Sequence, residues 1–227
     1  MDLEYTITRS PKRRKLTITV DRDRSVVVRA PEGTSDENIK RVVASKRQWI
    51  YEKTGHSQKY RNLPHAPGKE LVSGESAPYL GRQYRIEVVK NGGEEIQFAR
   101  HFLVPETQVA QRKAIFREWY MGRAKEKIIP RVNHHARELG VQYAEVKIID
   151  NRYRWGSCTV KDNVNFNWRL IKAPMFVIDY VIVHELAHLI EANHTPRFWN
   201  IVRSQLASVQ KAKQWLKDHG QLLEQAI

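Results

Sequence analysis

The segment His184-Glu185-Leu186-Ala187-His188, followed six residues later by His194, constrains this chain more than any other. On a helix, residues four positions apart share a face, so the imidazoles of His184 and His188 can converge on one ion, with Glu185 beside them. Three histidine ligands on Zn²⁺ leave the fourth tetrahedral position for water, whose pKa the metal lowers from about 15.7 to about 7. The pattern therefore predicts a hydrolytic zinc site in which Glu185 accepts the proton of that water.

The residues around this segment predict a buried helix followed by a turn. The ten preceding residues begin with Pro174 and are apolar on almost every side, which is typical of a helix inside a core. We expect Asn193 to cap the end of this helix, and Thr195 and Pro196 to begin the next one. His194 would then lie in the turn, free to fold back onto the metal. The alternative is a helix whose histidines only form hydrogen bonds, but burying these polar groups without a shared partner is unfavourable.

Four stretches of the chain together resemble a known family. They are Arg154-Trp155-Gly156-Ser157-Cys158, residues 165–170, residues 179–188 and residues 193–199. In these motifs the chain is similar to the YgjP-like family of bacterial metal-dependent hydrolases, which is related to the SprT-like zinc metallopeptidases. The clear match covers about residues 145–205. The resemblance implies a zincin-type catalytic fold with His184, His188 and His194 as metal ligands and Glu185 as base.

The resemblance leaves the substrate open. The family is named for its peptidase-like domain, whereas some members carry an assignment as UTP pyrophosphatases. We favour hydrolysis of a peptide bond in a peptide or protein substrate. Hydrolysis of a nucleoside triphosphate is the main alternative, although the sequence has no glycine-rich phosphate loop and no paired carboxylates for magnesium. A third alternative is a DNA-associated protease, in which a basic hairpin brings the metal site to its substrate.

A second cluster of chemically active residues precedes the metal motif. Arg152 or Arg154 can stabilise the negative charge of a tetrahedral or phosphoryl transition state. We expect Arg154 to act in catalysis; the alternative is a structural ion pair. The strands around this cluster are candidates for a wall that pairs with an extended substrate. Gly156 and Ser157 are expected to make a tight turn, and Cys158 to be a small buried side chain rather than a nucleophile.

The net charge of +14 indicates an anionic partner or substrate. The surplus is shared equally between residues 1–105 and 106–227, so a detachable nucleic-acid-binding tail is not expected. Seven basic residues cluster near the amino terminus: Arg9, Lys12, Arg13, Arg14, Lys15, Arg22 and Arg24. On a hairpin they would form a patch suited to non-specific contact with nucleic acid. The alternative is a solvated surface.

Cysteine usage and hydropathy favour a cytoplasmic protein. A single cysteine excludes an internal disulfide. Residues 1–9 lack the basic and apolar segments of a signal peptide. The apolar stretch 173–190 approaches the length of a membrane span, but it carries Asp179 and the ionisable residues of the metal motif, which are unfavourable in lipid. We therefore expect no membrane helix.

The hydrophobic pattern predicts an α+β protein in two parts. The predicted elements are a hairpin (16–20 and 26–30), a helix (35–53), a loop (56–69), strands (79–89 and 95–98), helices (107–127 and 130–139), strands (145–151 and 164–170), the motif helix, and a closing amphipathic helix that packs on the rest (208–219). We place the boundary near Pro105. Residues 1–105 would form a β-rich accessory region, and residues 106–227 the zincin-like hydrolase domain, with the motif helix packed on a small sheet.

Overall fold

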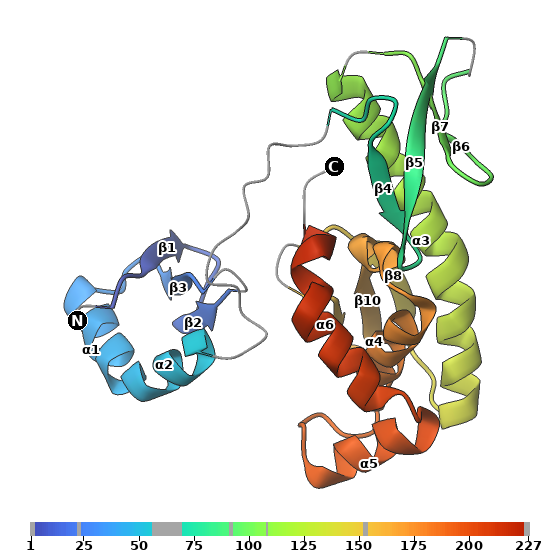
Figure 1. Ribbon diagram of the computed structural model, residues 1–227. Helices are drawn as coiled ribbons and strands as arrows, with labels where there is room; N and C mark the ends of the chain where they lie inside the picture. The colour runs from blue at the N-terminus through green and yellow to red at the C-terminus, as the bar shows by residue number, and fades with distance from the viewer. Residues whose placement is uncertain are drawn as a thin grey trace. The chain divides into compact units, whose positions relative to one another are not determined.

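The computed structural model describes residues 3–21, 24–55, 70–90, 93–107, 109–151 and 154–224. The chain divides into two compact units, Met1–Pro64 and His65–Ile227, which are described separately (Figure 1). Both units combine helices with small sheets, which confirms the predicted α+β class. The predicted loop at 56–69 lies outside the described residues. Among the described helices, none is both long and apolar enough to cross a membrane.

The first unit is a three-stranded sheet with two helices. Its elements are β1 (Thr6–Ser10), β2 (Thr17–Val20), β3 (Val26–Pro31), α1 (Asp36–Ser45) and α2 (Arg47–Gly55). The predicted hairpin forms, since β2 pairs antiparallel with β3. β1 adds to the other side of β3 in parallel. Alternate residues of β3, including the fully buried Val28 and Ala30, form the core of this unit together with residues of both helices.

The helix predicted over residues 35–53 forms as two shorter helices, α1 and α2. Ser35 caps α1 as expected, because its side-chain oxygen accepts a hydrogen bond from the backbone N–H of Asn38 at 3.3 Å. The break falls at Lys46, whose N–H donates to the carbonyls of Val42 and Val43 in the last turn of α1, at 3.2 and 3.1 Å. Ile50 of α2 is nevertheless fully buried, so both helices contribute to the same core.

The described residues of the second unit form two small sheets and four α-helices, joined by one 3₁₀ helix. Its elements are β4 (Ser76–Tyr79), β5 (Arg82–Val89), β6 (Gln97–Phe98), β7 (Phe102–Pro105), α3 (Val109–Leu139), β8 (Glu145–Ile149), β9 (Gly156–Cys158), β10 (Asn163–Asn167), η1 (Trp168–Lys172), α4 (Met175–Ala187), α5 (Pro196–Gln205) and α6 (Val209–Glu224). One sheet has the order β4-β5-β7-β6 and the other β8-β10-β9. In the second sheet β8 is parallel and β9 antiparallel to β10.

The boundary predicted near Pro105 falls inside the second unit, because the first of these sheets shares its core with α3. The ring of Phe102 on β7 lies 5.1 Å from the ring of Phe116 and 6.3 Å from that of Tyr120, both on α3. The hydroxyl of Tyr120 also donates a hydrogen bond to the carbonyl of Pro78 on β4 at 2.6 Å. All three aromatic side chains are fully buried, and they join the sheet to the helix that runs beside it (Figure 1).

α3 continues through Pro130 as one helix, although the sequence predicts two. Proline removes one backbone hydrogen bond and ordinarily kinks or ends a helix. Here Ile128 and Val132, on either side of it, are fully buried in the core. Arg131 forms an ion pair with Asp179 of α4. Tertiary contacts on both sides of the proline thus outweigh the missing hydrogen bond.

The turn between β4 and β5 holds the first sheet against the start of α4. Leu80 and Gly81 both have positive φ angles, of 47° and 80°. Their backbone N–H groups donate to the carbonyls of Ile171 and Lys172, each at 2.9 Å. A Cβ atom at Gly81 would lie 2.5 Å from Cγ of Pro174, so only glycine fits. This contact places the segment that leads into α4.

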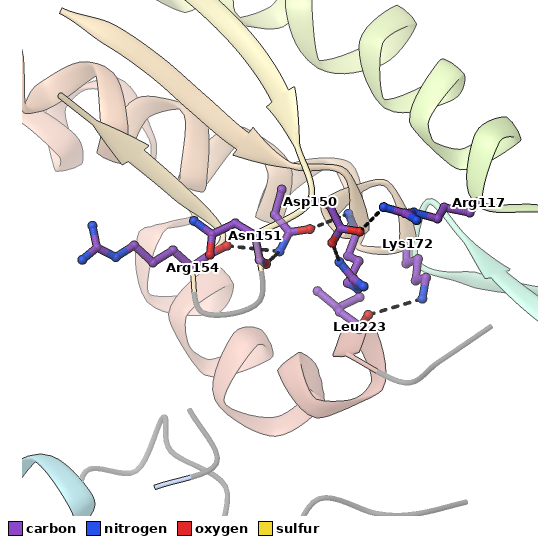
Figure 2. Close-up of polar contacts among 8 residues, drawn as sticks. Arg117, Asp150, Asn151, Arg154, Lys172 and Leu223 are labelled. Carbon is purple, nitrogen blue, oxygen red and sulfur yellow. Dashed lines mark hydrogen bonds and ion pairs between the residues drawn. The ribbon is translucent and has the colours of Figure 1, made fainter. Parts of the chain in front are cut away.

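Lys172 joins α6 to η1. It is only 3% exposed, and its Nζ donates a hydrogen bond to the carbonyl of Leu223 at 3.3 Å (Figure 2). The same ammonium group lies over the rings of Tyr120 and Trp168, at 5.7 and 5.3 Å. A cation at the carbonyl end of a helix is favourable, and a buried one requires such partners. This contact helps to hold the carboxyl end of α6 on the second unit.

Candidate metal centre

α4 is buried on almost every side, as predicted, and carries the first part of the metal motif near its end. Ile182, Val183 and Leu186 are fully buried. The helix ends at Ala187, with His188 as its C-cap. The last turn tightens into hydrogen bonds between residues three apart, so the helix stops before Asn193. The prediction that Asn193 caps this helix is therefore wrong.

α5 begins where the sequence predicts. The side-chain oxygen of Thr195 accepts a hydrogen bond from the backbone N–H of Phe198 at 3.3 Å, and Pro196 is the first helical residue. His194 directly precedes this cap and lies in the turn between α4 and α5. The capped helix thus fixes the path of the chain at the third histidine.

Three imidazole rings converge at this place. Nε2 of His184 lies 3.0 Å from Nε2 of His194. One ring nitrogen from each of His184, His188 and His194 lies within 4.8 Å of the other two. Nδ1 of His188 lies 3.2 Å from the carbonyl oxygen of Glu191, and a neutral imidazole that donates through Nδ1 keeps a free lone pair on Nε2. Nε2 of His188 is therefore available as a ligand.

The donor set fits a divalent metal ion. Burial, together with His188, His194 and Lys213, lowers the pKa of His184 to about 3, so this ring is neutral at neutral pH. Neutral imidazole is the form that binds metals. Lone pairs on two nitrogens 3.0 Å apart repel each other unless a proton or a cation lies between them. Three neutral imidazoles are a ligand set that zinc accepts.

Glu185 is buried beside the imidazoles, with 8% of its surface exposed. Burial raises its pKa to about 7, although the charge of Arg154 and a hydrogen bond from the backbone N–H of Cys158 act in the opposite direction. A carboxyl group with a pKa close to the ambient pH can both accept and return a proton. Such a value is common among groups that act in acid–base catalysis.

Gly156 forms the wall against which Glu185 lies. A Cβ atom at this position would come within 2.5 Å of Cγ and 2.8 Å of Oε1 of Glu185. The sequence predicts a tight turn at Gly156 and Ser157, but both belong to β9, which pairs antiparallel with β10. The contact between Gly156 and Glu185 is a feature of the site that the sequence does not reveal, although a glycine inside a strand is a known sign of close approach.

Arg154 is exposed and lies two residues before β9. Its charge acts on Glu185, while its backbone carbonyl accepts a hydrogen bond from the side chain of Asn167 at 3.1 Å. Figure 2 shows its side chain extending away from Asp150, which pairs instead with Arg117, at 2.5 Å, and with Arg169. Arg154 is thus not part of that ion cluster. Arg152, the other candidate, lies outside the described residues.

Cys158 is half-buried at the end of β9. Burial, followed by the charges of Glu185 and Asp162, raises the pKa of its thiol. A thiol with a raised pKa is a poor nucleophile, because the thiolate is the reactive form. The cysteine meets Glu185 through its backbone N–H.

The basic cluster of the sequence lies in the first unit, whereas the three imidazoles lie in the second. Arg9 pairs with Asp36 of α1, and Arg13 donates a hydrogen bond to the hydroxyl of Thr17 at 3.1 Å. Arg22 lies outside the described residues. Arg9 and Arg13 are thus engaged within their own unit.

Two imidazoles at the end of a buried helix, a third in the turn that follows, and a buried carboxyl group beside them are the arrangement of a metal-dependent hydrolase. The chain belongs to the YgjP-like family, since the model of that family's metallopeptidase domain matches residues 14–219. The match confirms the resemblance seen in the sequence motifs and extends it over most of the chain. No curated protein matches the chain.

Two solved structures are similar to less than half of the chain. The crystal structure of the metallopeptidase zymogen of Pyrococcus abyssi abylysin covers 44% of this chain and 99% of its own, with 20% sequence identity and a TM-score of 0.37. That of the metallopeptidase zymogen of Methanocaldococcus jannaschii jannalysin covers 42% of this chain and 97% of its own, with 21% identity and a TM-score of 0.35.

Proposed function

We propose that this protein is a zinc-dependent peptidase with a zincin-type centre, in which His184, His188 and His194 hold the metal and Glu185 is the general base. One observation carries the proposal: three imidazole nitrogens converge next to a buried carboxyl group whose pKa is raised to about 7. The metallopeptidase family to which the chain belongs supports it. Purified protein is expected to hold one zinc ion per chain.

The protein's own part in the reaction is proton transfer. Zinc, when bound, supplies Lewis acidity that polarises the scissile carbonyl and makes water a stronger acid. Glu185 accepts the proton of the attacking water and then donates it to the leaving amine. Its pKa near 7 suits both steps. The N–H of Cys158 and the backbone of Gly156 hold the carboxyl group in one orientation.

Arg154 is proposed as the residue that stabilises negative charge in the transition state. Its side chain is exposed, precedes β9, and is close enough for its charge to act on Glu185. A cation near developing negative charge lowers the reaction barrier by electrostatic attraction.

An extended peptide is the substrate that the sheet favours. β9 is at the edge of its sheet, since the strand order is β8-β10-β9, and Gly156 of this strand touches Glu185. A polypeptide that added to this edge would present its backbone to the base, because edge strands recognise main-chain amide groups. Among the described residues, no comparable feature at the site favours a nucleoside triphosphate or nucleic acid.

A side-by-side turnover assay tests the proposal. The zinc-loaded protein is incubated with an unstructured protein such as casein and, separately, with the four nucleoside triphosphates. We expect cleavage of the unstructured protein and no release of pyrophosphate or phosphate. Glu185→Gln is the matched control, because any activity of this site must decrease in it. Triphosphate hydrolysis that disappears in Glu185→Gln, without proteolysis in the unaltered protein, would replace the peptidase assignment with that of a nucleotide hydrolase.

A further inference from the structure

His194 is held differently from the other two imidazoles. His184 is part of α4 and His188 caps it, whereas His194 is exposed in the turn that follows. A side chain in an exposed turn loses rotational freedom when it binds a metal ion, and this loss weakens binding. Contacts that fix its ring in advance therefore determine how well the centre is formed before the metal arrives.

Trp199, in the first turn of α5, provides such a contact. Its ring stacks on the ring of His194, with a centroid distance of 5.6 Å and an interplanar angle of 21°. Phe198 meets the same imidazole edge-on, at 4.7 Å and 90°. Because one ring lies along the face of the imidazole and the other stands against it, the plane of His194 is defined from two directions.

Lys213 on α6 covers the indole ring. Its Nζ lies 4.2 Å from the centroid of Trp199, which is the geometry of a cation–π contact. Lys213, Trp199 and His194 thus form a chain of contacts that connects α6 with the turn. The sequence pattern of α6 predicts only a helix that packs on the rest of the unit. The contact of Lys213 with Trp199 is not predicted by that pattern.

We propose that Trp199 is a positioning residue for the third metal ligand, His194, and that Lys213 keeps Trp199 in place. The proposal rests on the proposed function, since it requires His194 to bind the metal. It concerns residues outside the ligand set, and it is measured as metal affinity rather than as catalysis.

Lys213 acts on a bound metal ion in two opposite ways. As a cation it repels a divalent ion, so its removal alone would tighten zinc binding. As a partner of Trp199 it keeps the indole against His194, so its removal would weaken zinc binding. The two effects separate in a double-mutant cycle, because the repulsion persists when Trp199 is replaced, whereas the stacked contact does not.

The test is the zinc dissociation constant of the full chain, measured by competition with a chelator. The variants are Trp199→Leu, Lys213→Met, their combination, and Lys213→Arg. We expect Trp199→Leu to raise the dissociation constant about 10- to 100-fold, the range found for residues that orient metal ligands. Lys213→Met should raise the dissociation constant about 2- to 5-fold more when Trp199 is present than in the Trp199→Leu background. Lys213→Arg should bind zinc as the unaltered protein does.

Lys211→Met is the matched control. Lys211 is on the same helix and makes the same kind of contact, with its Nζ 4.9 Å from the ring of Phe176, at the beginning of α4. Its replacement should leave zinc affinity unchanged. Thermal unfolding of each metal-free variant distinguishes a fold defect from a misoriented ligand. If Trp199→Leu does not fold, Trp199→Phe takes its place in the cycle.

The outcomes separate this inference from the proposed function. An unchanged dissociation constant in Trp199→Leu would overturn the role of the tryptophan, and an equal effect of Lys213→Met in both backgrounds would overturn that of the lysine. Failure of the unaltered protein to bind zinc would overturn the proposed function, and the inference with it. So would full zinc occupancy in a variant that combines His184→Ala with His188→Ala.

Discussion

The backbone of Gly156 lies directly against the carboxyl side chain of Glu185. A methyl group at this position would stand 2.5 Å from Cγ and 2.9 Å from Cδ, so either β9 or the carboxyl group would have to move. β9 and α4 are thus in close contact at the residue proposed as the base.

Gly156→Ala is therefore expected to reduce proteolysis about 100-fold, because a displacement of about 1 Å is enough for such a loss. Zinc content should remain that of the unaltered protein, since the three atoms nearest to the added methyl group all belong to Glu185, which is not a proposed ligand. Gly122→Ala is the matched control: this glycine is in α3 and has open space around its Cβ position. Activity assays measure the loss of proteolysis, and elemental analysis measures the zinc content. Unchanged turnover in Gly156→Ala would show that the site tolerates the displacement of β9 or of the carboxyl group.

Glu185→Gln should retain zinc and the fold but lose activity by about 10²- to 10⁴-fold. The amide has nearly the same size as the carboxyl group but cannot accept the proton of water. Glu138→Gln, at an exposed position of α3, controls for the loss of a negative charge. Turnover at the native rate in Glu185→Gln would show that this residue is structural.

The raised pKa of Glu185 also predicts how stability changes with pH in the metal-free protein. The pKa is about 7 in the folded chain and has a reference value of 4.5. Between these values the folded state holds the proton more tightly than the unfolded state, so stability falls as pH rises from 4.5 to 7. As pH rises from 4.5 to 7, the free energy of unfolding of Glu185→Gln should increase by about 3 kcal/mol relative to that of the unaltered protein.

The titration of His184 changes stability with pH in the opposite direction to that of Glu185. The contribution of Glu185 is therefore taken from the difference between the unaltered protein and Glu185→Gln. Its pKa is about 3 in the folded chain against a reference of 6.5, so the unfolded state binds the extra proton and stability rises with pH between these values. The two contributions partly cancel in the unaltered protein. Urea unfolding of both proteins in a chelator, at several pH values, gives the difference curve. A flat difference between pH 4.5 and 7 would show that the carboxyl group is not buried as described.

Asp179→Asn should destabilise the protein by about 1–3 kcal/mol. Burial raises the pKa of Asp179, but hydrogen bonds from His135 and Arg131 and their charges outweigh it, and the net pKa is lowered. The carboxylate therefore contributes stability above its reference pKa of 3.8, and this contribution is lost as pH falls through the lower folded value. Chemical unfolding at pH 7 measures the loss. Asp218→Asn, at an exposed position of α6, should change stability little.

The sequence predicts the local features of the candidate site because their signals are local. The apolar run before His184 predicts a buried helix, and Thr195 with Pro196 predicts the start of the next; both are confirmed. The hairpin of β2 and β3 likewise follows from alternation within two short segments. The position of His194 in the turn depends only on these neighbours, so it too is predicted correctly.

Features that depend on distant residues could not be predicted in this way. The contact of Gly156 with Glu185 and the ion pair of Arg131 with Asp179 join segments that are far apart in the sequence. Nothing near either residue shows which partner it will meet. Pro130 gives the opposite error: its local signal predicts a helix end, but burial on both sides keeps α3 continuous.

α3 makes the two halves of the second unit depend on each other when they unfold. At 31 residues it is about 46 Å long, and a single rod bears the hydrogen bond from Tyr120 to β4 and the ion pair from Arg131 to α4. Unfolding of either half of the second unit would expose residues of the core that both halves share. We expect the sheet β4-β5-β7-β6 and the imidazole cluster to unfold in one cooperative event, with similar amide exchange rates in β5 and α4. The sheet β4-β5-β7-β6 is thereby expected to help set the lifetime of the candidate metal centre.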